Sequence, residues 1–222
     1  MKEMTISSRD KLILRDLAKK QLDLSRTDLN QERIREWYAH NSLQGQRPMI
    51  HLEMGTFEHE IIPDLLKCQG EFAREIETSL YENFLNQELF DDDRVTPDYY
   101  AVFFDTWFNL FQIPIHVRSL NGSFGHEFPS VVEDLEADYH KLKNPSYGVN
   151  RESTAERFRV LQETFGDILP VKMSMPALYS VPTQMVVHFM KMEHMMYNIY
   201  DYPDLFQEMM GRIADDTLEY YR

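Results

Sequence analysis

Short apolar runs that alternate with long helical patterns constrain this chain most. Three such runs predict strands at residues 47–54, 99–104 and 169–174, and no two-residue hairpin turn joins one to the next. Between them, apolar residues recur at three- and four-residue intervals, which is typical of amphipathic helices. Parallel strands require crossovers of this kind. The order therefore predicts an α/β fold with a parallel sheet.

Capping residues and apolar spacing set the expected helices. Ser7 or Ser8 is expected to cap the first helix, Thr27 or Asp28 the second, and Gly70 begins a long third. One or two helical turns are expected at 61–67, and an extended piece at 113–118. Further helices are expected at 131–142, 154–165, 183–200 and 203–221, with a turn at 144–148.

The predicted strand at 47–54 has two different faces. Ile50, Leu52 and Met54 form an apolar face, whereas the opposite face carries His51 and Glu53 near the carboxyl end of the strand. This pattern is typical of a barrel strand that helices cover outside and that ends at the mouth of a site.

The number of strands is too small for a complete barrel. A complete eight-stranded α/β barrel needs about 250 residues, and only three strands are predicted among these 222. Residues 1–45 form a predicted helical cap, and the sequence ends in a strong helical pattern. Two interpretations remain open, a small open α/β sheet or the N-terminal part of a larger barrel. An unpaired edge on three apolar strands favours the second interpretation.

Charge and cysteine content exclude several classes. The net charge of −14 argues against a nucleic-acid-binding protein and against docking on an anionic membrane surface. Cys68 is the only cysteine, which excludes an internal disulfide and a multi-cysteine zinc site within this chain. No secretory signal or membrane-spanning run is present, so a cytoplasmic location is expected.

Several stretches of the chain carry a resemblance to a known family. They read RPMIHLEMGTFEHE (47–60), YYAVFFDTW (99–107), FPSVVEDLEADYHKLKNP (128–145), GDILPVKMSMPALYSVPTQ (166–184) and MEHMMYNIYDYPDLFQEMMGRIADDTLEYYR (192–222). Together they resemble the uroporphyrinogen decarboxylase-like family, which includes corrinoid-dependent methyltransferases. The resemblance implies a (β/α)8 TIM barrel of which about the first half is present, with a cap over 1–45 and a partial barrel over 46–222.

The resemblance also implies a catalytic role for Asp105. This residue matches the aspartate at the end of the family's second strand, which faces the pyrrole nitrogens in the decarboxylases. There an ionised carboxylate stabilises positive charge on a protonated ring. The alternative from the residues alone is that Asp105 caps a helix that begins at Thr106.

Six further residues are candidates for the site. His51 and Glu53 suit a general base pair or ligands, and the alternative is a structural role inside the barrel. Glu58 and His59 suit substrate binding, although a solvated helix start explains them equally. His116 and Arg118 share one face of the extended piece, where Arg118 is the best local cation for an anionic group.

The chain departs from the decarboxylases in its first strand and the loop after it. Family members carry arginines there that hold the substrate's carboxylates, whereas no arginine lies between Arg47 and Arg74 here. This departure indicates a divergent member. The acidic run at 91–93 is interpreted as a solvated loop rather than a metal site. Nine of 13 methionines lie from Met173 onward and predict either a helix core or a face for a corrinoid protein.

The functional expectation is therefore an enzyme of tetrapyrrole or corrinoid-linked chemistry. It would be a lyase of porphyrin biosynthesis that decarboxylates a porphyrinogen, or a methyltransferase that works with a corrinoid protein. No cofactor is expected within this chain. If the full-length protein is a methyltransferase, it would use zinc and a corrinoid. The expected partners are a small-molecule substrate or a corrinoid protein, with a homodimer left open and neither nucleic acid nor membrane involved. The alternative is a non-catalytic fragment or accessory domain that binds a partner barrel half.

Overall fold

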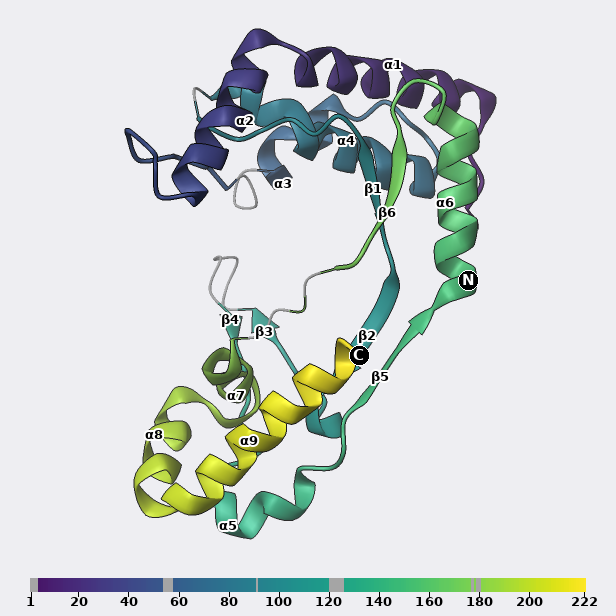
Figure 1. The fold of residues 1–222 in the computed structure, drawn as a ribbon. Helices are drawn as coiled ribbons and strands as arrows, with labels where there is room; N and C mark the ends of the chain where they lie inside the picture. The colour runs from purple at the N-terminus through teal and green to yellow at the C-terminus, as the bar shows by residue number, and fades with distance from the viewer. Residues whose placement is uncertain (1–3, 54–57, 91, 120–125, 177, 179–180) are drawn as a thin grey trace. The chain divides into compact units, whose positions relative to one another are not determined.

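The computed structural model describes residues 4–53, 58–90, 92–119, 126–176, 178 and 181–222 (Figure 1). The chain forms two compact units. Unit 1 comprises Met1–Phe104 and Arg151–Met175, and unit 2 comprises Asp105–Asn150 and Pro176–Arg222. Each unit encloses its own cluster of buried apolar side chains.

Unit 1 is built from helices and one pair of strands. Its elements are α1 (Ser8–Ser25), α2 (Asp28–Asn41), α3 (Glu58–Ile61), η2 (Pro63–Leu65), α4 (Glu71–Leu89), β1 (Tyr100–Phe103), α6 (Arg151–Phe165) and β6 (Val171–Ser174). The expected helix starts are confirmed for three of them. Ser7 caps α1 by accepting from the Asp10 N–H, Thr27 caps α2 in the same way through Asn30, and Gly70 precedes α4.

The two strands of unit 1 run parallel. β1 pairs with β6 so that Tyr100 lies opposite Val171 and Phe103 lies opposite Ser174. The predicted strands at 99–104 and 169–174 are therefore confirmed, and so is their parallel pairing. Because α6 leads into β6 and packs against both strands, the three elements form a β-α-β arrangement. The α/β class is confirmed by this arrangement.

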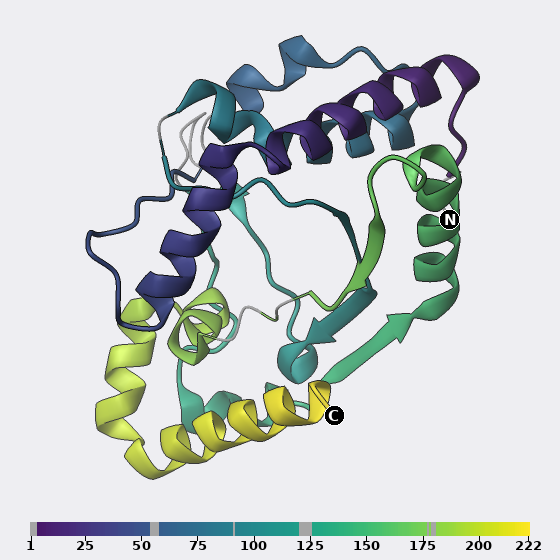
Figure 2. The same ribbon diagram turned by 45° about the horizontal axis from the view of Figure 1, so that its top comes forward.

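The core of unit 1 lies between one face of the β1–β6 pair and the helices α1, α4 and α6. Helix α1 packs against α4 and α6, as Figure 2 shows for its course along α4. Apolar side chains of all three helices are buried there together with Tyr100 and Val102 of β1. The Tyr100 and Phe165 rings meet edge to face at 5.5 Å between centroids, an arrangement that aromatic pairs favour.

Two buried carboxylates hold the segment that leads into α4. The Glu77 carboxylate accepts from the Lys67 N–H at 2.8 and 3.0 Å and from the Cys68 N–H at 2.8 Å. The Asp10 carboxylate accepts from the N–H groups of Gln69 and Gly70, each at 3.0 Å. Burial opposes ionisation of Asp10, but these N–H groups hold its pKa below the ordinary value. Residues 67–70 are therefore fixed without regular secondary structure.

Unit 2 contains short strands and three longer helices. Its elements are β2 (Asp105–Asn109), η3 (Leu110–Gln112), β3 (Arg118–Ser119), β4 (His126–Glu127), α5 (Leu135–Asp138), η4 (Tyr139–Lys141), β5 (Ser146–Asn150), α7 (Pro182–Met190), α8 (Met192–Asp201) and α9 (Pro203–Tyr220). The apolar faces of α7 and α9 enclose its core with Phe111, Val132 and Leu135.

The expectation of an exclusively parallel sheet is wrong. In unit 2, β2 pairs antiparallel with β5, and β3 pairs antiparallel with β4. The turn predicted at 144–148 lies partly in β5, where Gly148 stands opposite Trp107. A β-carbon on Gly148 would lie 2.5 Å from the Trp107 ring. The glycine that suggested a turn therefore makes room for a cross-strand indole.

The predicted strand at 47–54 is also wrong over the described residues 47–53. This segment contacts residues 92 and 93 through side chains and through one backbone hydrogen bond, from the Asp93 N–H to the Ile50 carbonyl at 2.7 Å, and no strand ladder forms. The Ile50 N–H donates to the Asp93 carboxylate at 2.7 Å, and the Leu52 N–H donates to the Asp92 carboxylate at 3.0 Å. Asp92 and Asp93 of the predicted solvated run are consequently buried, with 4% and 8% of their surface exposed, and Asp91 lies outside the described residues.

Two predicted helices are interrupted. The helix expected at 131–142 begins only at Leu135, because Asp134 caps it and the N–H groups of Val131 and Val132 donate to Phe189. The helix expected at 183–200 divides into α7 and α8 at Lys191, whose φ of 60° is left-handed. This break ends the α7 hydrogen-bond ladder and redirects the chain.

The described strands form three separate two-stranded sheets, and no closed barrel appears among them. The barrel, the cap over 1–45 and the partial barrel over 46–222 therefore stay predictions. Helix α1 from the expected cap shares the core of unit 1. Of the helices in the described ranges, none combines the length and apolarity that crossing a bilayer requires.

Gly148 and Gly211 offer a matched test of the unit 2 packing. Gly148→Ala is expected to lower the free energy of unfolding by about 1–3 kcal/mol, because the new methyl group overlaps the Trp107 ring. Gly211→Ala is expected to raise it by up to about 1 kcal/mol, since a β-carbon there meets nothing within 4 Å and Gly211 lies inside α9. Chemical denaturation measures both changes, and equal effects would contradict the proposed Gly148–Trp107 packing.

Candidate functional site

The helices of unit 1 cover one face of the β1–β6 pair except at Met173, which is 45% exposed, and leave the other face open. Tyr100, Val102 and Val171 face the core. The alternation along the strands places Ala101, Phe103, Lys172 and Ser174 on the opposite face. On that face, 54% of Phe103 is exposed, and the Lys172 ammonium lies 4.2 Å from the centroid of the Tyr99 ring.

Asp105 follows directly after the carboxyl end of β1. The N–H of the preceding Phe104 donates to the Ser174 carbonyl at 3.0 Å, which extends the parallel pairing to that point. Asp105 is itself exposed and begins β2. Because Thr106 lies in a strand, the alternative that Asp105 caps a helix is wrong. Carboxyl ends of parallel strands are where α/β proteins place their ligands.

His51 and Glu53 are exposed side chains of unit 1. They belong to the segment that Asp92 and Asp93 fix, so their backbone is held although no strand forms. Glu58 begins the short α3 with His59, and both side chains lie outside the described part of the molecule. The roles of these four residues stay predictions.

His116 and Arg118 are exposed residues of unit 2. Arg118 lies opposite Glu127 in the β3–β4 pair. A hydrogen bond from Lys191 at 2.8 Å lowers the pKa of Glu127, and the charge of Arg118 lowers it further. Glu127 would therefore compete with any anionic ligand for this pair of cations.

Sequence reasoning missed an ion cluster around Arg47. Its guanidinium donates to both carboxylate oxygens of Asp93, at 2.9 and 2.6 Å, and to Glu36 at 2.6 and 3.3 Å. The hydrogen bonds from Arg47 lower the pKa of Asp93 from 3.8 to about 2. The only signal in the sequence was an arginine 46 positions before Asp93, the last residue of an acidic run, and such a separation indicates no contact.

Two cavities lie away from the predicted site residues. One, of about 570 Å³, is lined by residues of α2 and of 95–99 in unit 1. The other, of about 430 Å³, lies in unit 2 between 108–115 and α7, with His188 among its mostly apolar side chains. Of the five predicted site residues whose side chains the structure describes, none lines either cavity.

Within the described ranges, no group of three or more His, Cys, Asp or Glu side chains is arranged to hold a metal ion. Comparisons with protein families, with curated proteins and with solved structures found no match. The assignment of function consequently rests on the sequence resemblance and on the geometry of the two units.

The Arg47–Asp93 pair predicts a defined acid sensitivity. With its pKa lowered to about 2 in the native state, the Asp93 carboxylate stabilises the fold above about pH 4. That contribution is lost as the pH falls from about 4 toward 2. The difference in free energy of unfolding between the wild type and Asp93→Asn should therefore shrink across this window, as measured by denaturation at a series of pH values.

The control is Asp23→Asn, which alters an exposed pair with Lys19 on α1. Exposed pairs of this kind contribute little to stability. A wild-type to Asp93→Asn difference that stays constant from pH 5 to about pH 2 would contradict the role assigned to Arg47.

Proposed function

We propose that this chain forms part of an enzyme of the uroporphyrinogen decarboxylase-like family, with Asp105 as its catalytic carboxylate. The reaction would be decarboxylation of a porphyrinogen or methyl transfer with a corrinoid protein. The observation that carries the proposal is the parallel pairing of β1 with β6, because Asp105 lies two residues beyond the carboxyl end of β1.

The two faces of the strand pair support this assignment. In a (β/α)8 barrel, helices cover the outside of each strand, and the inner face meets side chains of other strands. The helices of unit 1 bury Tyr100 and Val102, whereas Phe103 on the other face is 54% exposed. A large exposed aromatic side chain on a strand is what a barrel strand would show without its neighbours.

The chemistry suits a carboxylate at this position. Loss of CO₂ from a pyrrole side chain breaks a carbon–carbon bond, and its electron pair passes into a ring that has first been protonated. An ionised Asp105 would stabilise the cationic ring before the bond breaks. A proton then adds to the carbon that lost the carboxylate, and the ring releases the proton that it first took up, so that one proton replaces one carboxylate overall.

Arg47 supports the view that this is a divergent member. It is the last arginine before Arg74, and its guanidinium already binds the carboxylates of Asp93 and Glu36. Opening that cluster would leave the largely buried Asp93 without its charged partner. A polycarboxylate substrate would therefore need other groups to hold it.

Cys68 does not fit a zinc site. Burial, together with the neighbouring Glu77, raises the pKa of its thiol to about 12. A thiol must lose its proton to bind zinc. Zinc and a corrinoid, which the methyltransferase branch requires, would therefore need ligands other than Cys68.

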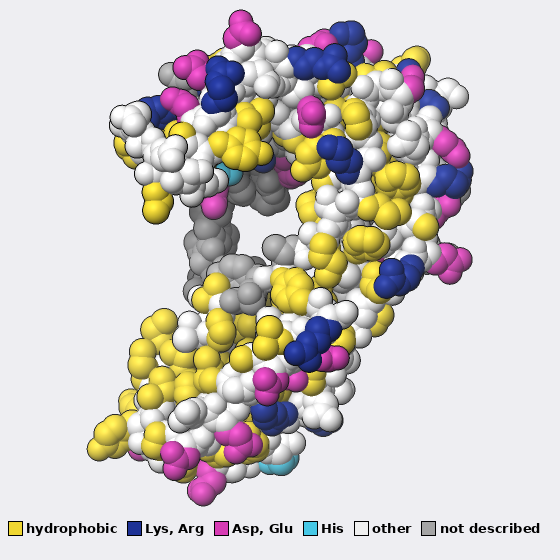
Figure 3. Space-filling view, in the orientation of Figure 1, with side chains coloured by type: hydrophobic (Ala, Val, Ile, Leu, Met, Phe, Trp, Pro, Cys, Tyr) yellow, Lys and Arg dark blue, Asp and Glu magenta, His cyan; other side chains and the backbone are white. Residues whose placement is uncertain are grey.

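Helix α8 supports binding of another protein, which would be a corrinoid protein in the methyltransferase branch or a partner barrel half in the second candidate, a non-catalytic accessory domain. Its outward stripe consists of Met192, Met196, Ile199 and Tyr200, spaced as one helical face and 42 to 87% exposed. Met195 lies on the buried side of the same helix, so the methionine-rich region contributes both to the core and to the surface. Figure 3 shows apolar side chains gathered over this part of unit 2. Such an apolar stripe is typical of a protein-binding surface.

Substitution of Asp105 tests the catalytic proposal. Asp105→Asn keeps the shape of the side chain but removes the charge, so turnover of uroporphyrinogen is expected to fall by about 10²-fold or more. Turnover is measured by chromatographic analysis of the carboxyl groups lost from uroporphyrinogen. The control, Asp64→Asn, alters another exposed carboxylate, in η2. Unchanged turnover in Asp105→Asn would show that Asp105 is not part of the site. If the wild type removes no carboxyl group from uroporphyrinogen, the decarboxylase hypothesis is wrong.

The α8 stripe has its own test. Met196→Glu places a charge in the middle of the stripe and is expected to weaken binding to a purified corrinoid protein by about tenfold or more. Sedimentation velocity measures the complex. Leu12→Glu, at a 67% exposed leucine of α1, is the matched control. Equal effects of the two substitutions would exclude a specific role for α8.

A further inference from the structure

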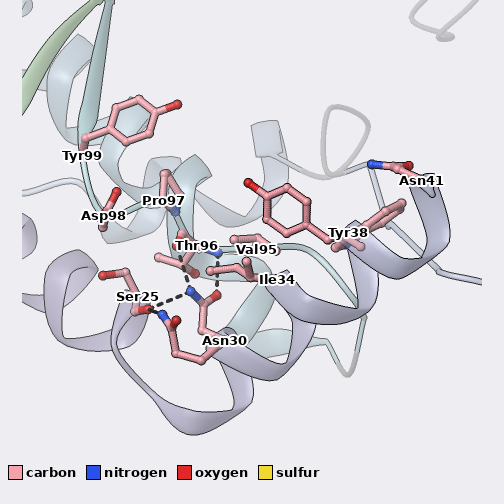
Figure 4. Close-up of a pocket in the computed structure, with 12 residues that line it drawn as sticks. Ser25, Asn30, Ile34, Tyr38, Asn41, Val95, Thr96, Pro97, Asp98 and Tyr99 are labelled. Atoms are coloured by element: carbon pink, nitrogen blue, oxygen red, sulfur yellow. Dashed lines mark hydrogen bonds between the residues drawn. The ribbon is translucent and has the colours of Figure 1, made fainter. Parts of the chain in front are cut away.

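A groove in unit 1 lies away from every residue used above for catalysis. It runs between α2 and residues 95–99 and has a volume of about 570 Å³ (Figure 4). Sites for small molecules are usually of this size, with apolar walls and a few placed polar groups. The lining residues come from the end of α1, from one face of α2 and from the approach to β1.

The floor of the groove is rigid before any ligand arrives. Asn30 is fully buried and donates to the carbonyls of Ser25 and Thr96 at 2.8 and 3.1 Å, while its own oxygen accepts from the Thr96 N–H at 2.8 Å. The Trp37 indole N–H donates to the Asp93 carbonyl at 2.6 Å. These bonds fix α2 against 93–96, so the groove keeps its width.

The rim of the groove carries aromatic rings and polar side chains. Figure 4 shows Tyr38 and Tyr99 on separate walls, with Asp98 beside Tyr99 and Asn41 beyond Tyr38. Tyr38 is 73% exposed, so its ring face is available to a ligand. The groove therefore combines flat apolar surfaces with a carboxylate and a carboxamide.

The charges around the groove select against ionic ligands. The Lys172 ammonium lies 4.2 Å from the Tyr99 ring centroid, so a cationic ligand would meet a positive charge beside that ring. An anionic ligand would meet Asp98 and the field of a chain with net charge −14. A purely apolar ligand would make no hydrogen bond with the exposed Asp98 and Asn41 side chains on the rim. A neutral ligand with many hydroxyl groups satisfies all three conditions.

We propose that this groove binds a short neutral saccharide. The C–H face of a sugar ring would lie on the exposed ring of Tyr38, where flat apolar contact excludes water. Its hydroxyl groups would donate to the Asp98 carboxylate and exchange hydrogen bonds with the Asn41 carboxamide. This site is independent of the catalytic proposal, since Asp105 does not line the groove.

Trp37 provides the readout because it lines the groove. The chain has two tryptophans, so Trp107→Phe leaves Trp37 as the only indole. We would titrate this variant with cellobiose, maltose and N,N′-diacetylchitobiose and follow its fluorescence. At least one sugar is expected to give a saturable change with a Kd of about 1 mM or tighter. The absence of a saturable change with all three would overturn the proposal.

Two substitutions place the binding in the groove. Tyr38→Ala and Asp98→Ala are each expected to weaken sugar binding by about tenfold or more, because each removes a surface or an acceptor that the sugar uses. Tyr197→Ala, at a 59% exposed tyrosine of α8, is the matched control and should bind as the parent does. Thermal melting checks that all variants remain folded.

The remaining outcomes also decide the proposal. Unchanged affinity in Tyr38→Ala would overturn it, as would saturable binding of choline or phosphate in place of the sugars. Asp105→Asn should bind sugar like the parent. If that variant loses turnover but keeps sugar binding, the two sites are separate, and failure of one leaves the other standing.

Discussion

The parallel pairing of β1 with β6 constrains the whole chain. Two parallel strands cannot be joined by a tight turn, so the chain must travel a long way between them. Here it leaves β1 at Phe104, builds part of unit 2 over 105–150 and returns through α6. It then enters unit 2 again after Met175. Each unit is therefore assembled from segments distant in sequence, and such contacts form slowly because loop closure precedes them.

Buried carboxylates take the place of a strand ladder in unit 1. Glu77 and Asp10 accept four backbone N–H groups between Lys67 and Gly70, and Asp92 and Asp93 accept those of Leu52 and Ile50. Hydrogen bonds to charged groups contribute about 1.5–3 kcal/mol each. The irregular segments before α4 and before β1 are consequently fixed by hydrogen bonds to carboxylates without pairing as strands.

Local signals in the sequence were sufficient for most helices. Ser7, Thr27 and Gly70 mark the starts of α1, α2 and α4 because capping depends only on residues three or four positions away. The strands β1 and β6 were recognisable because buried parallel strands are continuous apolar runs. Their pairing also followed from the absence of hairpin turns between them.

Other features depended on partners far along the chain. The role of Gly148 is set by Trp107, and the burial of Asp93 is set by Arg47. Of the candidate site, the position of Asp105 beyond β1 was predictable, since it follows an apolar run directly. The groove between α2 and 95–99 was not, because it exists only through the bonds between Asn30 and Thr96.

The chain's single thiol has a consequence for following its motions. Cys68 is 2% exposed, lies in the segment that Asp10 and Glu77 hold, and has its pKa raised to about 12. A thiol in this state reacts with alkylating reagents only when the segment opens and the proton is released. Its labelling rate therefore reports how often the region before α4 separates from α1, without any introduced probe. The native sequence thus contains one chemical probe of local unfolding, placed beside Asp10 of α1 and Glu77 of α4.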